Sequence, residues 1–377
     1  LSGKVAGVKV TQTSGQPGSP ASIRIRGSNS LQGGNEPLYV IDGMPVYGGG
    51  GEISALATLN PENIQSIEIL KDASSTAIYG ARASNGVVLI STKGGEAGRD
   101  RITFDATYGV ASVVRKIDVM EAPEYAELVN QARINDGLEV FYTPEQMQEI
   151  RSMGAGTDWQ EELYRPAPRQ NYNLTFSGGD ERTTYSITGG FLDEQGIIPN
   201  SNFNRYNGRV NLQRNFSDNF TTGARLNMTH IDASLSKTGG GGYGSLMYGA
   251  LRMNPIQPVY QDKEAGIYTL RNEPGVETPN PVASAKEMTD ERSSSRVMGD
   301  IYAQWEFLPG LEAQVKMGAD LNYNKRDHYT PSNIYEGRNV TSAYINSSKS
   351  INWINENTLR WDKQFSEDHS LTVLGGI

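Results

Sequence analysis

The sequence predicts a mostly β fold in two parts: a small α+β domain, followed by the antiparallel strands of a membrane barrel. Two observations predict this fold. Short apolar runs, separated by turn and cap residues, fill residues 37–93. From Asp100 onward, segments of roughly ten residues alternate apolar and polar side chains, the period of two that places different side chains on the two faces of a strand.

The small domain is organised around the stretch P-L-Y-V-I-D-G-M-P-V at residues 37–46. Asp42-Gly43 predicts a tight hairpin turn between two strands, because this dipeptide accepts positive φ angles. Asn60 before Pro61 predicts the start of a short helix. The predicted elements are strands at Leu38–Ile41, Met44–Tyr47, Ser66–Leu70 and Val87–Thr92, and short helices after Asn60 and from Asp72 to Gly80.

The second part contains about nine segments with the alternation of a transmembrane strand. Each is close to the roughly ten residues that cross a bilayer at a tilt. Alternation is weaker in the last two. The segments are 101–110, 172–176, 185–191, 206–212, 224–228, 297–307, 313–321, 352–361 and 371–377.

Period-two alternation also fits a soluble β-sandwich, and the connections decide between the two folds. They alternate long and short, as in outer-membrane barrels with external loops and short periplasmic turns. The long loops are predicted at 115–170, 235–294 and 328–349, with helical inserts at 122–136 and 144–153 in the first. Aromatic residues near strand ends suit interfacial girdles: Tyr108, Tyr172, Phe191, Tyr206, Phe220, Trp305, Tyr323 and Trp361.

Composition excludes several other classes of protein. The chain of 377 residues has no cysteine, so it has neither a disulfide scaffold nor a thiolate metal site. Its net charge of −9 and the absence of a basic patch argue against nucleic-acid binding. It has no run of about eighteen apolar residues, so we expect no transmembrane helix.

Lipid offers no hydrogen-bond partner for an open strand edge, so a sheet that spans a membrane must close on itself. The chain also starts at Leu1 without an initiator methionine or a signal peptide, and it stops at Ile377 inside an apolar run. We therefore expect a fragment of a longer precursor, with the remaining strands beyond Ile377.

Five stretches in one order carry a family resemblance. They are S-G-K-V-A-G-V-K-V-T-Q-T-S-G-Q-P-G-S (2–19), I-R-I-R-G (23–27), S-L-Q-G-G-N-E-P-L-Y-V-I-D-G (30–43), N-P-E-N-I-Q-S-I-E-I-L-K-D-A-S-S-T-A-I-Y-G (60–80) and N-G-V-V-L-I-S-T-K (85–93). Together they resemble the plug domain of TonB-dependent outer-membrane transporters, in the wording of the SusC/RagA family. Residues 81–84 depart from the glycine-richer segment expected there. The resemblance implies a plug domain at 1–98 and the N-terminal part of the barrel at 99–377.

The resemblance also implies a function and partners. The whole protein would import a nutrient actively across the Gram-negative outer membrane, most often an oligosaccharide and sometimes a peptide, with the plug gating the lumen. Energy would come from the TonB-ExbB-ExbD complex through a segment upstream of Leu1. A SusD-like surface lipoprotein would cover the barrel, and outer-membrane lipid would surround it.

Site residues follow only from this resemblance. Arg24 and Arg26 alternate with Ile23 and Ile25, which is typical of a half-buried strand with a solvated basic face. The resemblance favours the view that these arginines pair with carboxylates on the barrel wall and anchor the plug. Substrate-facing plug loops are expected at Gly33, Gly34, Asn35 and Glu36 and at Tyr47 and Glu52.

We find no pattern that predicts catalysis, a cofactor or a metal site. The three histidines, His230, His328 and His369, are far apart and form no H-E-x-x-H pair. No G-x-S-x-G elbow is present, and Gly239–Gly244 lacks the lysine of a phosphate loop. Two alternatives stay open at this point: a secreted β-rich carbohydrate-binding or adhesive module, and a receptor for a siderophore or cobalamin.

Overall fold

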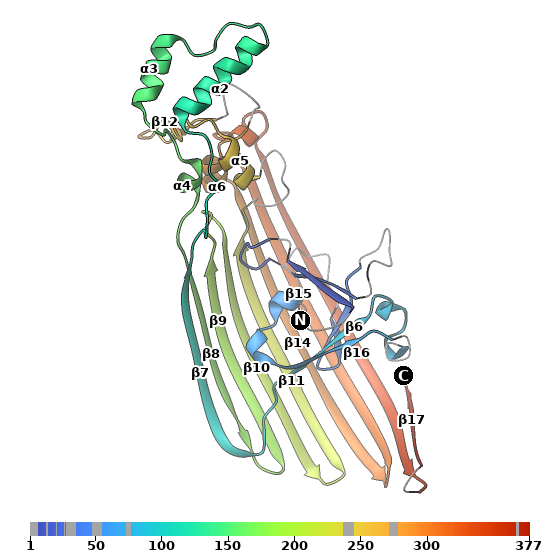
Figure 1. Cartoon of the computed structure of the whole chain (residues 1–377). Helices are drawn as coiled ribbons and strands as arrows, with labels where there is room; N and C mark the ends of the chain where they lie inside the picture. Colours follow the sequence, from blue (N-terminus) through green and yellow to red (C-terminus); the bar gives the residue numbers. More distant parts are fainter. Residues whose placement is uncertain are drawn as a thin grey trace.

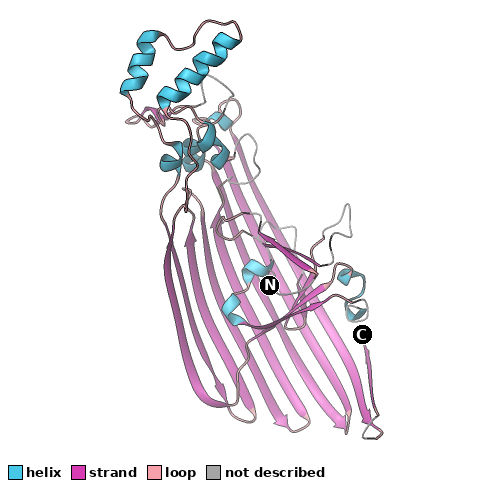
Figure 2. Ribbon diagram, viewed as in Figure 1, coloured by secondary structure: helices cyan, strands magenta, loops and turns pink. Residues whose placement is uncertain are grey.

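A small domain lies on the concave face of a large curved sheet, and a group of helices caps one end of that sheet (Figures 1 and 2). The computed structural model describes residues 7–12, 14–19, 21–25, 27, 35–46, 55–72, 77–236, 245–270, 278–366 and 369–377. None of the helices in these ranges is long and apolar enough to cross a membrane.

The small domain is centred on a four-stranded sheet in the order β4-β3-β6-β5. The central pair, β3 and β6, is parallel, while the two outer pairs are antiparallel. Because β3 is covered on both faces, all four of its residues are buried, as the unbroken apolar runs predict. The strands are β3 (Leu38–Ile41), β4 (Met44–Val46), β5 (Ile64–Leu70) and β6 (Val87–Thr92), beside a separate pair β1 (Val8–Gln12) and β2 (Ala21–Ile25).

The turns of the small domain follow the predicted signals, with shorter helices. Asp42 (φ 49°) and Gly43 (φ 80°) form the predicted hairpin turn. The Asn60 side chain accepts a hydrogen bond from the Glu62 amide, yet the helix that follows is one 3₁₀ turn, because β5 already starts at Ile64. Part of the second helix, predicted from Asp72 to Gly80, lies outside the described residues; a 3₁₀ segment covers Ala77–Ala83, with a break at Gly80 (φ 62°), the predicted stop. The 3₁₀ segments are η1 (Ala55–Thr58), η2 (Pro61–Asn63) and η3 (Ala77–Ala83).

The large sheet has nine strands, and every strand pairs antiparallel with its sequence neighbours in the sheet. All nine predicted strands are present, and the fold prediction is confirmed. Short turns join the strands at one end and long connections join them at the other. The strands are β7 (Gly98–Ala111), β8 (Ala167–Gly179), β9 (Thr183–Gln195), β10 (Asn202–Ser217), β11 (Phe220–Ser234), β14 (Thr289–Leu308), β15 (Leu311–Thr330), β16 (Ser342–Gln364) and β17 (Ser370–Gly376).

The sheet exposes its apolar face and buries its polar face, which is the reverse of the arrangement in a water-soluble protein. Its large apolar side chains point away from the small domain, and Phe104, Ile301 and Met317 are 64%, 61% and 55% exposed. Polar side chains on the opposite face, such as Arg209 and Lys316, are buried instead. A secreted sandwich would bury its apolar faces, so the alternative of a secreted β-rich module is wrong.

Two rows of aromatic side chains cross the strands at levels that match a bilayer. Near the capped end, Tyr172, Phe191, Tyr206 and His230 lie in register on β8 to β11, with ring centroids 6.5, 5.0 and 6.4 Å apart. Near the other end, Phe220 is paired with Trp305. Phe220 and His230 are ten residues apart on β11, which at about 3.3 Å per residue and a tilt of about 40° spans about 25 Å. That is the height of the apolar band of an outer-membrane barrel.

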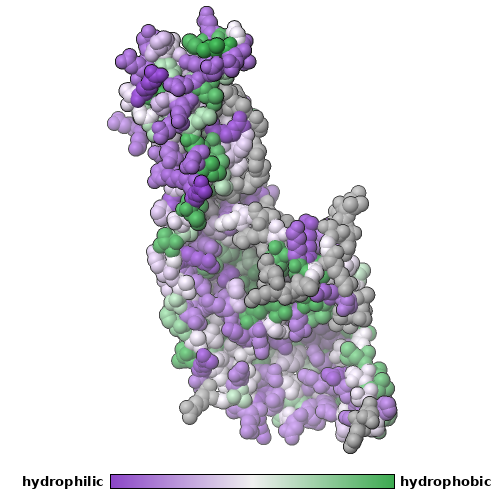
Figure 3. All heavy atoms as spheres, in the orientation of Figure 1, coloured by the Kyte–Doolittle hydropathy of each residue, from purple (hydrophilic) through white to green (hydrophobic). Residues whose placement is uncertain are grey.

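The long connections fold into a cap, defined here as the described parts of residues 112–166, 235–288 and 331–341. Its core joins segments distant in sequence, with Trp159, Leu246, Val282 and Ile334 all buried together. Hydrophilic side chains gather on this cap and at the opposite ends of the strands (Figure 3). The elements are α2 (Ala122–Asn135), α3 (Pro144–Ser152), α4 (Trp159–Leu163), α5 (Leu246–Arg252), β12 (Tyr260–Asp262), β13 (Ile267–Tyr268), α6 (Pro281–Glu287) and η4 (Tyr335–Gly337).

Two of the predicted loops are shorter than predicted. The loop predicted at 235–294 ends where β14 starts at Thr289, and the loop predicted at 328–349 is confined to 331–341 between β15 and β16. The strands continue past the apolar band into a region where most side chains on both faces are polar, so alternation of apolar side chains no longer marks them. The first predicted loop, 115–170, overlaps the connection between β7 and β8, which contains both predicted helices, but its last four residues belong to β8, which starts at Ala167.

Candidate functional site

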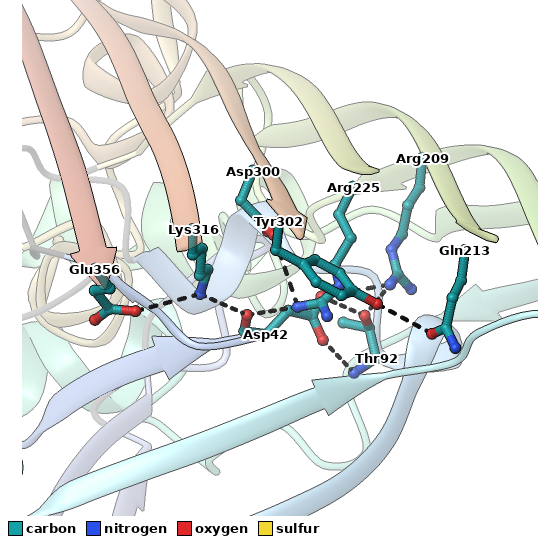
Figure 4. Close-up of polar contacts among 9 residues, drawn as sticks. All are labelled: Asp42, Thr92, Arg209, Gln213, Arg225, Asp300, Tyr302, Lys316 and Glu356. Carbon is teal, nitrogen blue, oxygen red and sulfur yellow. Dashed lines mark hydrogen bonds and ion pairs between the residues drawn. The ribbon is translucent and has the colours of Figure 1, made fainter. Parts of the chain in front are cut away.

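The hairpin turn of the small domain, Asp42-Gly43, contacts the inner face of the large sheet (Figure 4). The Asp42 carboxylate accepts two hydrogen bonds from Thr92 at the end of β6, one from its backbone N–H (2.9 Å) and one from its hydroxyl. The turn is therefore fixed to the central strand of its own domain. Positive φ at both turn residues gives the sharp reversal that brings Asp42 to the wall.

Three cationic side chains of the sheet converge on this turn. Arg209 of β10 places Nη2 3.4 Å from Asp42 Oδ2, and it also donates to the Thr92 hydroxyl and, over 3.1 Å, to the Lys93 carbonyl. Arg225 of β11 donates to the Asp42 carbonyl over 2.7 Å, and Lys316 of β15 donates to the same oxygen over 3.2 Å. Each cation stands on the polar, inward face of its strand, so three strands hold one turn.

Two carboxylates and a tyrosine of the sheet complete the cluster. Asp300 lies 3.9 Å from Arg225, and Glu356 lies 3.9 Å from Lys316. The Tyr302 ring faces the Arg225 guanidinium at 5.0 Å, and its hydroxyl donates to Gln213. A cavity of about 350 Å³ opens beside the turn, lined by Asp42, Gly43, Arg225, Tyr302, Gln304, Gln314, Lys316 and Glu356.

A second group of polar contacts ties residues 57–62 to β8, β10 and β11. Arg205 donates to the carbonyls of Ala57 and Leu59 over 3.2 and 3.0 Å, and the Thr229 hydroxyl donates to the Thr58 carbonyl over 2.9 Å. The side chains of Asn60 and Glu62 hydrogen-bond Asn173 and Asn171 of β8. In this group, as at Asp42, side chains of the wall bind backbone or side-chain groups of the small domain.

The segment that links β6 to β7 lies directly against the sheet. A Cβ atom on Gly95 would overlap the backbone of Tyr185 in β9, so only glycine allows this approach. Next to it, a polar cavity of about 820 Å³ separates the small domain from β7 to β10, with Glu62, Arg101, Asp105 and Arg209 among its lining. The small domain thus touches the wall at discrete points, with open space between them.

The site residues inferred from the resemblance are not among those that form the contacts described above. Arg24 is on β2 with an exposed side chain, Asn35 is half-buried and Glu36 is exposed. Arg26, Gly33, Gly34, Tyr47 and Glu52 lie outside the described residues. The roles assigned to all of these residues stay predictions.

The sequence did not predict the wall cations that contact the Asp42 turn. We expected the anchoring cations on the small domain, whereas the structure has them on the wall. A signal was present, because Arg209, Arg225 and Lys316 stand on the polar face of three predicted strands, well inside the span that crosses the bilayer. Charges at that depth face the interior and are functional more often than not.

The fold and this interface define the class of protein: an outer-membrane barrel with a plug. Comparisons with known proteins agree. Residues 1–87 match the family described as TonB-dependent Receptor Plug Domain. TonB-dependent receptor P3 of Formosa agariphila is 32% identical over 100% of this chain and 36% of its own length. TonB-dependent receptor SusC of Bacteroides thetaiotaomicron is 31% identical over 93% of this chain and 36% of its own length.

Solved structures give the same answer. The RagAB peptide importer in its open-open state superposes with a TM-score of 0.82 and 27% identity, over 99% of this chain and 44% of that chain. A ferric enterobactin receptor of Pseudomonas aeruginosa, with a TM-score of 0.53 and 13% identity over 98% of this chain and 44% of that chain, shares the fold alone. Over 93–100% of its length the chain is similar to TonB-dependent receptors of the SusC/RagA type, and like them it is an outer-membrane protein. It spans just over a third of the length of the curated relatives that it matches.

Proposed function

We propose that the protein containing this chain imports a nutrient actively across the outer membrane, and that its plug gates the barrel lumen. The observation that carries the proposal is the small domain seated on the concave face of the sheet and held through hydrogen bonds and ion pairs. Polar contacts exchange with water at a small net cost, and the cavities at this interface bring water close to them. Such an interface can part and re-form without unfolding the barrel.

Energy for parting would come from the TonB-ExbB-ExbD complex of the inner membrane, acting through a segment that precedes the plug. We propose an oligosaccharide as the substrate, with a peptide as the second candidate. The family resemblance to SusC/RagA supports the first, and the likeness to a structure described as a peptide importer supports the second. A SusD-like surface lipoprotein is the proposed partner above the cap.

The test uses the full-length gene in its native host. The membrane is extracted with mild detergent, the receptor is run on gels with and without boiling, and co-purifying proteins are identified. We expect a band whose mobility changes on boiling, together with a lipoprotein.

Uptake of fluorescent oligosaccharides and peptides is then compared in cells with and without the gene and with and without a proton-motive force. Uptake that is equal with and without the gene, and with and without a proton-motive force, would contradict active import.

A further inference from the structure

Arg209 depends on the plug for all its polar partners. Among the described residues, its guanidinium donates to Lys93 and Thr92 and pairs with Asp42, and all three belong to the plug. The Arg209 side chain is only 7% exposed. If the plug parts from the wall, this arginine keeps its charge and loses these three contacts.

Arg225 and Lys316 lose part of their compensation in the same event. Each donates to the Asp42 carbonyl at short range, while the carboxylates that the wall offers them, Asp300 and Glu356, are 3.9 Å away. With the plug in place the cluster holds three cations and three carboxylates. Removing Asp42 leaves one positive charge in excess on three neighbouring groups.

A partly enclosed and uncompensated cation is costly, so it recruits an anion from the solution that fills the lumen. A guanidinium offers a fork of N–H donors that matches the two oxygens of a carboxylate, sulfate or phosphate. Arg209 and Arg225 stand on adjacent strands, and Lys316 lies on the opposite side of Asp42 from Arg209 (Figure 4). The vacated space therefore has donors on two sides.

We propose that Arg209, Arg225 and Lys316 form an oxyanion-binding site on the wall of the open lumen, which the Asp42 turn occupies in the closed state. The ligand is the carboxylate, sulfate or phosphate group of a substrate in transit. This inference rests on the proposed gating by the plug. The plug's own carboxylate is in this view a stand-in for the substrate's anion, so the wall favours acidic substrates over neutral ones.

The experiment measures ion selectivity of the full-length receptor in planar lipid bilayers across a KCl gradient. Urea, which solvates peptide groups, is added in graded amounts to loosen the plug, and the reversal potential gives the chloride-to-potassium permeability ratio. We expect the opened wild-type channel to favour chloride. In Arg209→Gln the ratio should fall by roughly fivefold. This factor corresponds to the interaction energy of two unit charges about 4 Å apart in a water-like medium.

The control is the double variant Arg296→Gln/Asp320→Asn. Arg296 and Asp320 are a buried pair within the wall, joined by hydrogen bonds of 2.8 and 2.6 Å, so the variant removes one cation and one anion together. It should keep the wild-type ratio.

A second measurement tests millimolar sulfate, phosphate and acetate separately as blockers of the current. Each should block the Arg209→Gln channel more weakly than the wild-type channel, and their blocking strengths rank the three oxyanions.

Failure of this inference and failure of the proposed function look different. A channel that opens in urea with the same selectivity in wild type and Arg209→Gln refutes the oxyanion site and leaves plug gating intact. A receptor that passes no current at any urea concentration that keeps the barrel folded, checked by gel mobility without boiling, refutes gating and the site with it.

Discussion

The guanidinium of Arg209 reaches a carboxylate 167 residues earlier in the chain, with Nη2 3.4 Å from Oδ2 of Asp42. One residue stands on a strand of the barrel wall, and the other forms the turn of the plug. The pair is shielded from water, with 7% and 17% of the two side chains exposed. It is one of the contacts through which the wall holds the plug's hairpin, and its consequences can be measured.

Asp42→Asn should loosen the plug without changing its fold. Asparagine tolerates the positive φ of the turn and can still accept from Thr92, but it removes the charge that compensates Arg209. Breaking one partner of a buried pair costs about 3 kcal/mol, which is roughly a hundredfold in hydrogen exchange. Exchange at Ile41 and Met44 is the readout.

The control for this variant is Asp218→Asn, which removes a carboxylate from the exposed turn between β10 and β11. It should leave exchange in the plug unchanged. Equal protection of the hairpin in Asp42→Asn and in the control would show that the charge of Asp42 does not hold the plug.

Gly95→Val should impair docking of the plug on the wall. The new side chain meets the backbone of Tyr185, which belongs to a paired strand and cannot move aside. Overpacking costs about 1–3 kcal/mol, so we expect increased protease sensitivity of the linker. Gly109→Val is the matched control, because a Cβ there has open space around it. Similar sensitivity in both variants would contradict a tight approach at Gly95.

Ile301→Arg tests the orientation of the sheet. Ile301 is 61% exposed and lies between the two aromatic levels on β14. An arginine at the bilayer midplane on the lipid face costs about 2–4 kcal/mol, so the yield of assembled barrel should drop. Gln304→Arg, on the opposite face and beside a cavity, should cost much less. The reverse order of yields would mean that the sheet faces the other way.

Asn280→Ala should unfold part of the cap and spare the barrel. The Asn280 side chain caps α6 through the amides of Val282 and Ala283, and it donates to the carbonyls of Val259 and Thr269, both over 2.9 Å. The residue is 1% exposed, so its loss leaves buried groups unsatisfied at about 1–3 kcal/mol. Proteolysis within residues 245–288 should accelerate while gel mobility without boiling stays unchanged.

The exposed Asn333, which donates to Glu287 over 3.3 Å, provides the comparison for that experiment. Asn333→Ala should leave the proteolysis rate at its wild-type value. Loss of barrel assembly in Asn280→Ala would show that cap and barrel fold as one unit.

Local patterns in the sequence predicted the fold well. Asp42-Gly43, the alternation along β7 to β11, and the helices α2 and α3 each depend on neighbours within a few residues, so local sequence predicts them. The upper ends of β14, β15 and β16 were missed because polar side chains cover both of their faces there. The helices α5 and α6 were missed because each is only seven residues long and is stabilised by packing against distant parts of the cap.

The candidate site was only partly predictable, for a different reason. The alternation of the strands predicts that Arg209, Arg225 and Lys316 face inward. It does not predict that all three contact the same plug residue, because that depends on the curvature of the sheet and on how the plug sits against it. Asp42 was identified for the shape of its turn rather than for its charge. Contacts between residues 167 to 274 positions apart, as here, have no local signal.

The most direct test of plug gating uses the full-length receptor with Asn60→Cys and Asn173→Cys. The two side chains touch across the interface between plug and wall, and the described chain has no cysteine of its own. A short, reducible bifunctional thiol reagent would tether them, and conductance in KCl would be recorded in the urea range that opens the untethered receptor. We predict no current while the tether holds and full current after reduction. The same current with the tether intact would contradict the claim that ions pass through space that the plug vacates.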